Sequence, residues 1–560
     1  MYATLLNEHL PLVYDVSVIT NSLTNENKVD IKFLDENGKS FYKATYHQVY
    51  PETLYNLIKN GETIEFENSY IKGFSLTEYR KILIMSTESM VQIGSVIFKK
   101  CFFDCEEDID FTYSLFQGDV VFDSVIFANG EVEFYASNFG NSNVKYTNCR
   151  FGKGPVNFKS TRFGEGNISF QGSNFGNGDL IFADTDFGNG NVSFKSITLI
   201  KGNVDFKFAK FSEGGITFER AEFGEGKKDF KNVEFGGGRL DFRRVNFNNG
   251  DVLFEGVEFG TGKVNFRGSS FGEGSISFVL ADFSHGEANF DNVEFGEGIL
   301  SFNQANADRI SFKECQFNSH VDLRFSKCNH IDLSNTVVRD IIDVQPIDEH
   351  VVIKEMNITN MRILGRMFIN WRENNVHSLI YSQQDTSFFQ KAEQFRILKE
   401  NFRTNGQYED EDLSYIEFKR CEARSELEDE IKSNSFVKYI AYPKYYFQKY
   451  VFDSVGRFGT APSRVIMNAL ITVFIFGFIY YIATNFFPHI GAVESSLPDN
   501  IKHVNEFLTC MYYSAITFFT IGYGDYFPYG LLKVFSVLEG FTGVFLMSYF
   551  TVAFVRKILR

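Results

Sequence analysis

The sequence predicts a multidomain protein with a right-handed β-solenoid, an α-helical adaptor and an all-α domain that crosses a membrane twice. Three observations predict this order. A phenylalanine recurs every twelve residues through the middle of the chain, a helical apolar pattern follows it, and two long apolar runs lie near the C-terminus. A fixed short repeat is typical of a solenoid. An apolar run of about 20 residues is long enough to span a bilayer.

Composition limits the classes of function. The formal net charge of −16 and the pI near 5.2 argue against nucleic acid as a partner. The seven cysteines form no Cys-x-x-Cys pair and no cluster with histidine, so we expect reduced thiols and no cofactor. The soluble part shows no nucleophile, acid–base pair or metal-ligand cluster, and we therefore expect no enzyme.

Residues 1–96 precede the repeat, and we assign them to a mixed α/β cap region. The chain opens on Met1-Tyr2-Ala3-Thr4 and continues into a polar, acid-bearing segment. A secretory signal peptide needs a basic start and an apolar stretch, which this segment lacks. We expect the N-terminal part to stay in the cytosol.

The repeat occupies residues 97–345. A phenylalanine stands at every twelfth position from Phe127 to Phe295 with Leu199 as the substitute, and a second aromatic follows seven residues after each. The consensus is Phe-Gly-x-Gly-x-Val-x-Phe. Its Val-x-Phe alternation predicts a short strand with one buried face. Its Phe-Gly-x-Gly part predicts a turn in which glycine supplies positive φ.

The aromatics are thus spaced seven, five, seven, five, and small or branched residues such as Ala209 and Val233 lie two positions before those in the five-residue phase. This pattern loosely resembles the pentapeptide-repeat family from Ile97 to Asp343, which implies a right-handed, four-sided solenoid. One unit per turn leaves too little interior for two phenylalanines, so we expect two units per coil, about seven coils and a rod of about 35 Å. Lys228 stands where valine is expected and predicts a local irregularity.

Residues 346–464 are predicted to form the helical adaptor. Apolar residues recur at helical spacing over 392–402, Asn405-Gly406 marks a stop, and 413–432 makes a second helix. This hairpin resembles the one that follows pentapeptide repeats in some bacterial membrane proteins. The segment 439–452, rich in tyrosine and lysine, is either an amphipathic segment at the cytoplasmic membrane face or a plain interdomain helix.

The last region, residues 465–560, contains an outer helix at 465–487, a short apolar pore helix at 505–519 and an inner helix at 531–555. The middle run is too short to cross a membrane but long enough for a re-entrant helix. Non-helical backbone at membrane depth is tolerated only where it is buried in protein or lines a water-filled path. The segment 520–525, between the pore helix and the inner helix, is expected to lie in such a place.

That segment reads Thr520-Ile521-Gly522-Tyr523-Gly524-Asp525. It resembles the signature filter of potassium channels, and the resemblance covers Val465 to Arg560. In that family, four copies of the loop present rings of carbonyl oxygens that replace the water shell of a potassium ion. Gly522 and Gly524 reach the required backbone torsions without a Cβ penalty.

The resemblance also implies roles for neighbouring residues. Thr517 and Thr520 fit the Thr-x-x-Thr-x-Gly-Tyr-Gly pattern, with Thr517 supporting the pore and the Thr520 hydroxyl supplying the innermost ligands. Tyr523 would pack outward, and Asp525 would be the acid at the outer mouth. Phe519 departs from the pattern, since a small hydroxyl residue is common there, and this leaves open how residues pack behind the filter.

The inner helix carries three candidate functional residues. Gly540 and Gly543 interrupt its apolar run, and Gly543 falls where channels of this type have a hinge glycine. Small residues in membrane helices are as often close-packing contacts as hinges. Glu539 is costly at membrane depth unless it pairs or faces water, so it is either functional or a hydrogen-bonding support behind the pore helix.

Charges at the helix ends predict orientation. The connecting segment carries Glu494, Asp499 and Glu506 with Lys502, whereas basic residues flank the two spans on their other sides, at Lys444, Lys449, Arg457, Arg464, Arg556, Lys557 and Arg560. Positive charge stays on the cytoplasmic side. We therefore expect a multi-pass protein of the cell membrane with both termini in the cytoplasm and the filter opening outward.

Together these observations predict a homotetrameric potassium channel in a lipid membrane, with potassium ions held by filter carbonyls. A non-selective cation channel and a membrane-anchored β-solenoid scaffold are the alternatives. The chain stops soon after the second span, so we expect control to come from the N-terminal side, through an unknown cytoplasmic ligand or protein on the solenoid. We expect this control to act either through the segment 439–464 on the outer helix or through direct contact of the hairpin with Arg556, Lys557 and Arg560, whose positive charge suits the acidic stretch 422–430.

Overall fold

A computed structural model describes residues 13–20, 27–35, 37–105, 108–347, 352–433, 438–496 and 505–559. The contacts divide the chain into two units, Met1–Gln384 and Asp385–Arg560. Residues 1–4, Asp499, Lys502 and Arg560, on which some of the expectations above rest, lie outside the described residues.

The first unit begins with a mixed α/β region. Its strands β1, β2 and β3 are antiparallel, and β3 then pairs in parallel with β5. The bounds are β1 Val13–Thr20, β2 Asn27–Leu34, β3 Ser40–Val49, α2 Pro51–Asn60, β5 Ser69–Lys72 and α3 Leu76–Ile82. Ser75 caps α3 by accepting a hydrogen bond from the Glu78 amide, which satisfies one of the free amides at the helix start.

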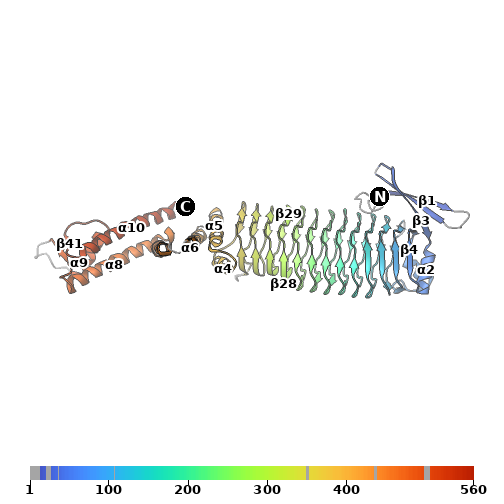
Figure 1. Cartoon of the computed structure of the whole chain (residues 1–560), viewed down its shortest axis with the longest axis horizontal. Helices are drawn as coiled ribbons and strands as arrows, with labels where there is room; N and C mark the ends of the chain where they lie inside the picture. The colour runs from blue at the N-terminus through green and yellow to red at the C-terminus, as the bar shows by residue number, and fades with distance from the viewer. Residues whose placement is uncertain are drawn as a thin grey trace. The chain divides into compact units, whose positions relative to one another are not determined.

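Parallel strands then stack into a β-solenoid (Figure 1). One ladder contains β4 Ile64–Glu67, β7 Val96–Lys99, β11 Val120–Asp123, β14 Val144–Thr147, β16 Ile168–Ser169, β18 Val192–Ser193, β21 Ile216–Thr217, β24 Leu240–Asp241, β26 Val264–Asn265, β28 Asp282–Asn289, β31 Asn306–Ser311, β34 Lys327–Asp332 and β37 Ile353–Asn357. The second contains β9 Ile109–Asp110, β13 Val132–Glu133, β15 Val156–Asn157, β17 Leu180–Ile181, β19 Val204–Asp205, β22 Lys228–Asp229, β25 Val252–Leu253, β27 Ile276–Ser277, β30 Leu300–Ser301, β33 Val321–Asp322, β36 Ile341–Asp343 and β39 Arg366–Phe368.

Shorter strands and single bridges form two further sides, so the coil is four-sided. One of these sides contains β8 Phe102–Asp104, β12 Ile126–Phe127, β29 Glu294–Phe295, β32 Gln316–Phe317, β35 Val337–Val338 and β38 Arg362–Ile363, and the other contains β6 Val91–Ile93, β10 Ser114–Phe116, β20 Lys210–Phe211 and β23 Glu234–Phe235. Paired residues such as Val120 and Val144 are 24 positions apart. Two twelve-residue units therefore make one coil, as predicted.

The solenoid has more coils than the regular Phe-Gly repeat indicates. Its longest sheet has 13 strands, whereas the sequence predicts about seven coils. The extra coils lie on both sides of the regular part, from Ile64 onward and as far as Phe368. They keep the parallel strand pairing but lack the Phe-Gly sequence. Alternating buried residues are enough there, because the edge of an existing sheet can pair with a further strand.

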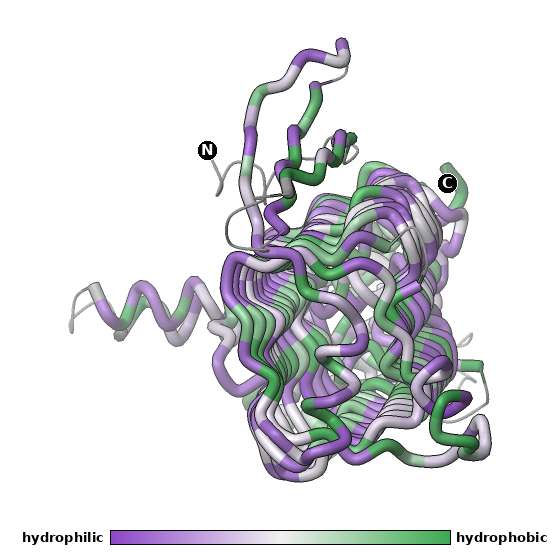
Figure 2. Tube along the Cα trace, turned by 90° about the vertical axis from the view of Figure 1, so that its right-hand side faces the viewer, coloured by the Kyte–Doolittle hydropathy of each residue, from purple (hydrophilic) through white to green (hydrophobic). Residues whose placement is uncertain are grey.

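The interior is filled by columns of stacked phenylalanine rings. In the column that runs from Phe134 to Phe302, successive ring centroids lie 4.6 to 5.1 Å apart. Leu199 is buried where its column would otherwise hold a ring. Figure 2 shows the coils in register along the solenoid. Burying each ring contributes roughly 2 kcal/mol, so the repeated aromatics contribute strongly to the stability of the solenoid.

The repeat glycines have two roles. As predicted, the glycine after the first aromatic has positive φ at some turns, as at Gly176 (63°) and Gly188 (61°). A second position with positive φ lies two residues after the second aromatic and is mostly not glycine, as at Ser160 (57°) and Asn232 (55°). At Gly178 and Gly202, a Cβ would lie 1.9 and 1.8 Å from the carbonyl oxygen of the glycine one coil earlier. These glycines are required because backbones of neighbouring coils approach closely there.

Lys228 does not disturb the ladder, so the predicted irregularity is wrong. Strand β22 pairs with Val204 on one side and Val252 on the other without a break in register. The Lys228 side chain is fully buried, and its Nζ donates to the Asn249 carbonyl oxygen. Burial lowers the pKa of Lys228 to about 8, because the charged form loses its hydration.

The first unit ends with α4 Val376–Tyr381, and the second is helical. Its elements are α5 Phe388–Thr404, α6 Tyr408–Ser433, α7 Lys438–Phe447, the π-helical η1 Gln448–Ser454, the 3-10 helix η2 Arg457–Gly459, α8 Pro462–Phe486, β40 Val493–Ser495, α9 Glu506–Phe518, β41 Tyr526–Pro528 and α10 Leu532–Ile558. Ser387 and Gln390 form a capping box at the start of α5, and Gly406, with φ of 74°, follows its end. The predicted helical hairpin is confirmed.

Candidate ion pathway

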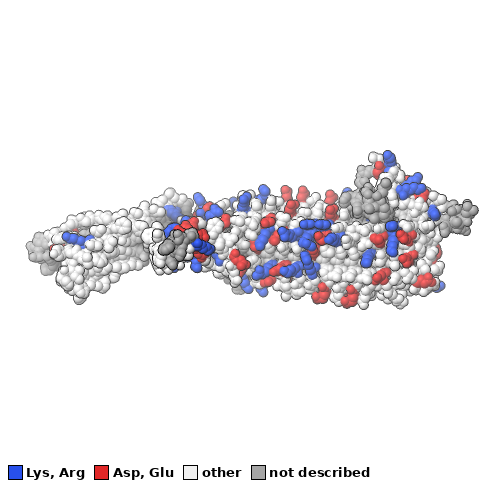
Figure 3. All heavy atoms as spheres, viewed as in Figure 1, with Lys and Arg blue, Asp and Glu red and all other residues white. Residues whose placement is uncertain are grey.

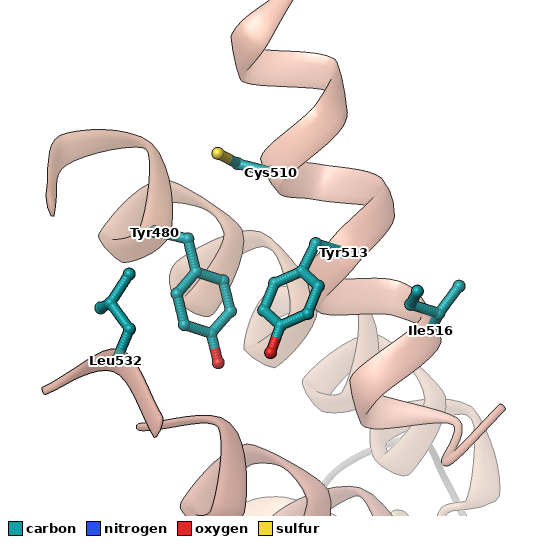
Figure 4. Packing of buried hydrophobic residues seen from close by; sticks show 5 residues of the cluster. All are labelled: Tyr480, Cys510, Tyr513, Ile516 and Leu532. Atoms are coloured by element: carbon teal, nitrogen blue, oxygen red, sulfur yellow. The ribbon is translucent and has the colours of Figure 1, made fainter. Parts of the chain in front are cut away.

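Helices α8, α9 and α10 pack around a common core. Tyr480 of α8, Leu532 of α10 and three residues of α9 form this buried cluster (Figure 4), the three being Cys510, Tyr513 and Ile516. Helices α8 and α10 are long and apolar enough to cross a membrane. The face of these helices seen in Figure 3 is almost free of charged atoms, as lipid contact requires.

The segment after α9 folds back on the helix and then extends. The amide of Thr520 donates to the Thr517 carbonyl at 3.1 Å, and the amide of Ile521 donates to the Ile516 carbonyl at 2.8 Å. Gly522 and Gly524 both have positive φ, 57° and 80°. This agrees with the reason given above for glycine at these two positions.

Ser496, just after β40, holds the outer end of this segment. Its hydroxyl donates to the Gly524 carbonyl at 3.0 Å, and its amide donates to the Asp525 carbonyl at 2.9 Å. Sequence reasoning missed Ser496, because nothing in the linker sequence marks which residue reaches the filter. The antiparallel pair β40 and β41 brings the two together.

The filter side chains lack cover within one chain. Tyr523 is 72% exposed and Ile521 is 48% exposed, although both are large hydrophobic residues. Phe519, at the end of α9, is 45% exposed. Exposed apolar surface of this kind marks a site of contact with protein or membrane.

A buried carboxyl group joins the three helices. Glu539 of α10 is fully buried, and its Oε2 accepts a hydrogen bond of 2.6 Å from the Tyr480 hydroxyl. Its Oε1 is hydrogen-bonded to the hydroxyl of Ser514 on α9. A second link joins Tyr513 and Ser536 at 2.7 Å.

The two inner-helix glycines differ in their surroundings. A Cβ on Gly543 would lie 2.0 Å from the carbonyl oxygen of Phe518, at the end of α9, whereas the nearest atom to a Cβ on Gly540 is the Thr517 carbonyl oxygen at 3.8 Å. Helix α10 runs without interruption past both. Of the two roles considered for Gly543, these contacts favour close packing.

A tight elbow before α8 contacts the inner helix. The Tyr549 hydroxyl accepts from the Gly459 amide at 2.9 Å and donates to the Phe452 carbonyl at 2.8 Å. Arg457 and Phe458 have positive φ of 48° and 52°, which is unfavourable for residues with a side chain. Tyr549 thus stabilises an elbow that is strained by itself.

The end of α10 also contacts the adaptor hairpin, through Asp412 of α6. The residue is 7% exposed, and its carboxylate lies 3.6 Å from the Arg556 guanidinium and 3.3 Å from Lys557 Nζ. The Arg556 guanidinium also stacks on the Tyr415 ring, 3.9 Å from its centroid. Cation and aromatic face attract each other at this distance.

The predicted partner of this basic end, the acidic stretch 422–430, is wrong. Glu426 and Glu430 instead bind Lys444, at 3.0 and 2.9 Å. The end of α10 contacts the first turns of α6, where Asp412 lies. The acidic charge along α6 was not enough to predict which turn makes this contact.

The segment 439–452 forms α7 and part of η1, with Tyr439 and Tyr450 strongly exposed. Exposed aromatics next to a membrane helix are consistent with an interfacial position. The alternative of an interdomain helix stays open.

Comparisons with known proteins agree with this geometry. Residues 468–560 match the family model described as "Ion channel". No curated protein and no solved structure matches the chain. The C-terminal region is therefore an ion-channel pore domain with two candidate transmembrane helices, joined to an N-terminal parallel β-solenoid.

Proposed function

We propose that this pore domain forms a potassium-selective channel in the cell membrane, with ions bound by the carbonyls of residues 520–524. The observation that carries the proposal is the left-handed backbone at Gly522 and Gly524, at the end of the short helix α9. Rings of carbonyl oxygens of this kind replace the hydration shell of potassium. The carbonyl end of α9 adds partial negative charge that favours a cation.

We also propose a homotetramer. One chain supplies one filter segment, and ion coordination from all sides requires a closed ring. The exposure of Ile521 and Tyr523 supports this, because neighbouring copies would cover them. Asp525 would then form a ring of acids at the outer mouth, with both termini in the cytoplasm.

Bi-ionic measurements on the purified protein in liposomes test selectivity. Potassium and rubidium should pass far better than sodium, and barium should block. Gly522→Ala should abolish selectivity or current, because φ of 57° is strained for alanine, while the solenoid stays folded. Tyr523→Asp should do the same. Equal permeability to sodium and potassium would favour the non-selective channel, and absence of any flux would favour the scaffold.

Mass determination in detergent tests the assembly. The conducting form should be a tetramer, and a monomer or dimer as the conducting species would contradict the proposal. The solenoids need not follow the same fourfold symmetry.

We further propose that cytoplasmic control enters through the adaptor hairpin. The contact of Asp412 with Arg556 and Lys557 supports this, because it links α6 to the end of the inner helix. Such coupling requires two states with different contacts.

A further inference from the structure

The carboxyl group of Glu539 lies where the three pore-domain helices meet, and the hydrogen atoms around it can be counted. Ser514 Oγ lies 2.8 Å from the Val473 carbonyl oxygen and also within hydrogen-bond distance of Glu539 Oε1. A serine hydroxyl has one hydrogen to donate. The Val473 carbonyl, like Glu539 Oε1 in a carboxylate, can only accept.

An ionised Glu539 leaves one of these two contacts without a hydrogen. If Ser514 donates to Glu539, its oxygen faces the Val473 oxygen at 2.8 Å with nothing between them. If Glu539 is instead a neutral acid, its own O–H donates to Ser514 and Ser514 donates to Val473. Tyr480 donates to the other carboxyl oxygen in both cases, so only the neutral acid gives each of the contacts from Glu539 to Ser514 and Tyr480, and from Ser514 to Val473, a hydrogen.

The surroundings also favour the neutral acid. The titratable groups near Glu539 are Tyr480 of α8 and Tyr513 of α9, and neither of them is a cation. Among the described residues, no basic side chain forms an ion pair with Glu539. An unpaired charge in a buried site at membrane depth is costly.

We propose that Glu539 is a positioning residue that carries a proton in the conducting channel and holds α9 in place behind the filter. The chain of hydrogen bonds runs from α10 through Ser514 of α9 to Val473 of α8. Loss of the proton breaks one link in this chain, and α9 directly precedes the filter. The inference rests on the proposed potassium selectivity and adds a dependence on pH.

The test measures the sodium-to-potassium permeability ratio of the tetramer in liposomes from about pH 6 to about pH 10. In the unsubstituted protein this ratio should rise by about tenfold at alkaline pH, as expected for loss of one buried hydrogen bond. Glu539→Gln keeps a donor and an acceptor in place of the acid and cannot ionise. It should therefore stay selective over the whole range.

Two results would overturn the proposal. One is a pH-independent ratio in the unsubstituted protein together with loss of selectivity in Glu539→Gln, which would mean that the charged carboxylate is needed. The other is an infrared spectrum of the unsubstituted tetramer at neutral pH without an acid band that disappears at alkaline pH, and this measurement decides even if the variant fails to assemble. Poor selectivity of the unsubstituted protein at every pH would instead contradict the proposed function.

Discussion

Several single residues in this protein matter because there is no room for a side chain at their position or because they bury an ionisable group. Gly178, Gly202 and Gly543 each lie where a Cβ would meet a carbonyl oxygen at about 2 Å or less, and real Cβ atoms do not approach so closely. Lys228 and Glu539 are fully buried ionisable groups. Gly543 and Lys228 each allow a mutational prediction in which a substitution at a second residue is the control.

Gly543→Ala should disrupt the pore, because its Cβ would collide with the Phe518 carbonyl at the end of α9. Overpacking of this kind costs about 1 to 3 kcal/mol. We expect weaker tetramers in detergent and at least a severalfold lower potassium flux. Gly540→Ala is the matched control, since its Cβ has room, and equal effects of the two substitutions would show that helix flexibility rather than packing matters.

Lys228 should make solenoid stability depend on pH. Its pKa in the folded protein is about 8, against an ordinary value of 10.5. Between these two values the unfolded chain binds more protons, so stability should rise as pH increases from about 8 to about 10.5. Lys228→Met should raise stability at neutral pH by on the order of 2 kcal/mol and remove this rise.

Thermal unfolding of the full-length protein, followed by the β-sheet circular dichroism signal, measures both effects. Lys263→Met is the control, because Lys263 is 77% exposed. A stability profile of Lys228→Met that runs parallel to that of the unsubstituted protein would contradict the assignment.

At the scale of elements, the connection between α6, the elbow and α10 decides how the hairpin reaches the pore. Asp412 binds two basic residues of α10, and Tyr549 of α10 binds the elbow on both sides of Gly456. Arg420 of α6 binds Asp453 of η1 at 2.8 Å, and this raises the pKa of the arginine. The inner-helix end is thus held by two separate groups of contacts.

Asp412→Asn should raise the open probability by about fivefold, because the inner-helix end loses its ionic contact with α6. The reversal potential should stay the same, since the filter is untouched. Single-channel recording measures both quantities. Glu428→Gln is the control, because Glu428 lies in the same helix and contacts only Arg424 among the described ion pairs; a similar response from it would mean that overall charge is responsible.

Elements were more predictable than their contacts. The aromatic spacing predicted the 24-residue coil because each strand pairs with a copy of itself, and Asn405-Gly406 predicted the end of α5 because glycine there relieves a local strain. The positive φ of Gly522 and Gly524 followed for the same local reason. Asp412 and Ser496 were not predicted, since their partners are distant in sequence and depend on how helices pack. The coils before residue 97 and after residue 345 were missed because they keep only the strand pairing and not the Phe-Gly signature.

At the scale of the whole molecule, the proposed division is between a pore that selects and a cytoplasmic part that controls. Deleting residues 1 to about 435 removes the solenoid and Asp412 but leaves the elbow and α8 to α10. We expect a channel with unchanged selectivity and altered open probability. An open probability that is the same across a range of voltages and pH would assign the solenoid to docking or localisation.

The four-sided coil also sets a rule for changes in length. Because residues pair with partners 24 positions away, removing one whole coil brings identical sides back into register and shortens the stack by about 4.8 Å. Removing twelve residues instead places strands of one long ladder onto the other and turns every later coil by half a revolution. Insertions or deletions of whole 24-residue coils should therefore cost little stability, so the length of the solenoid can change only in discrete steps.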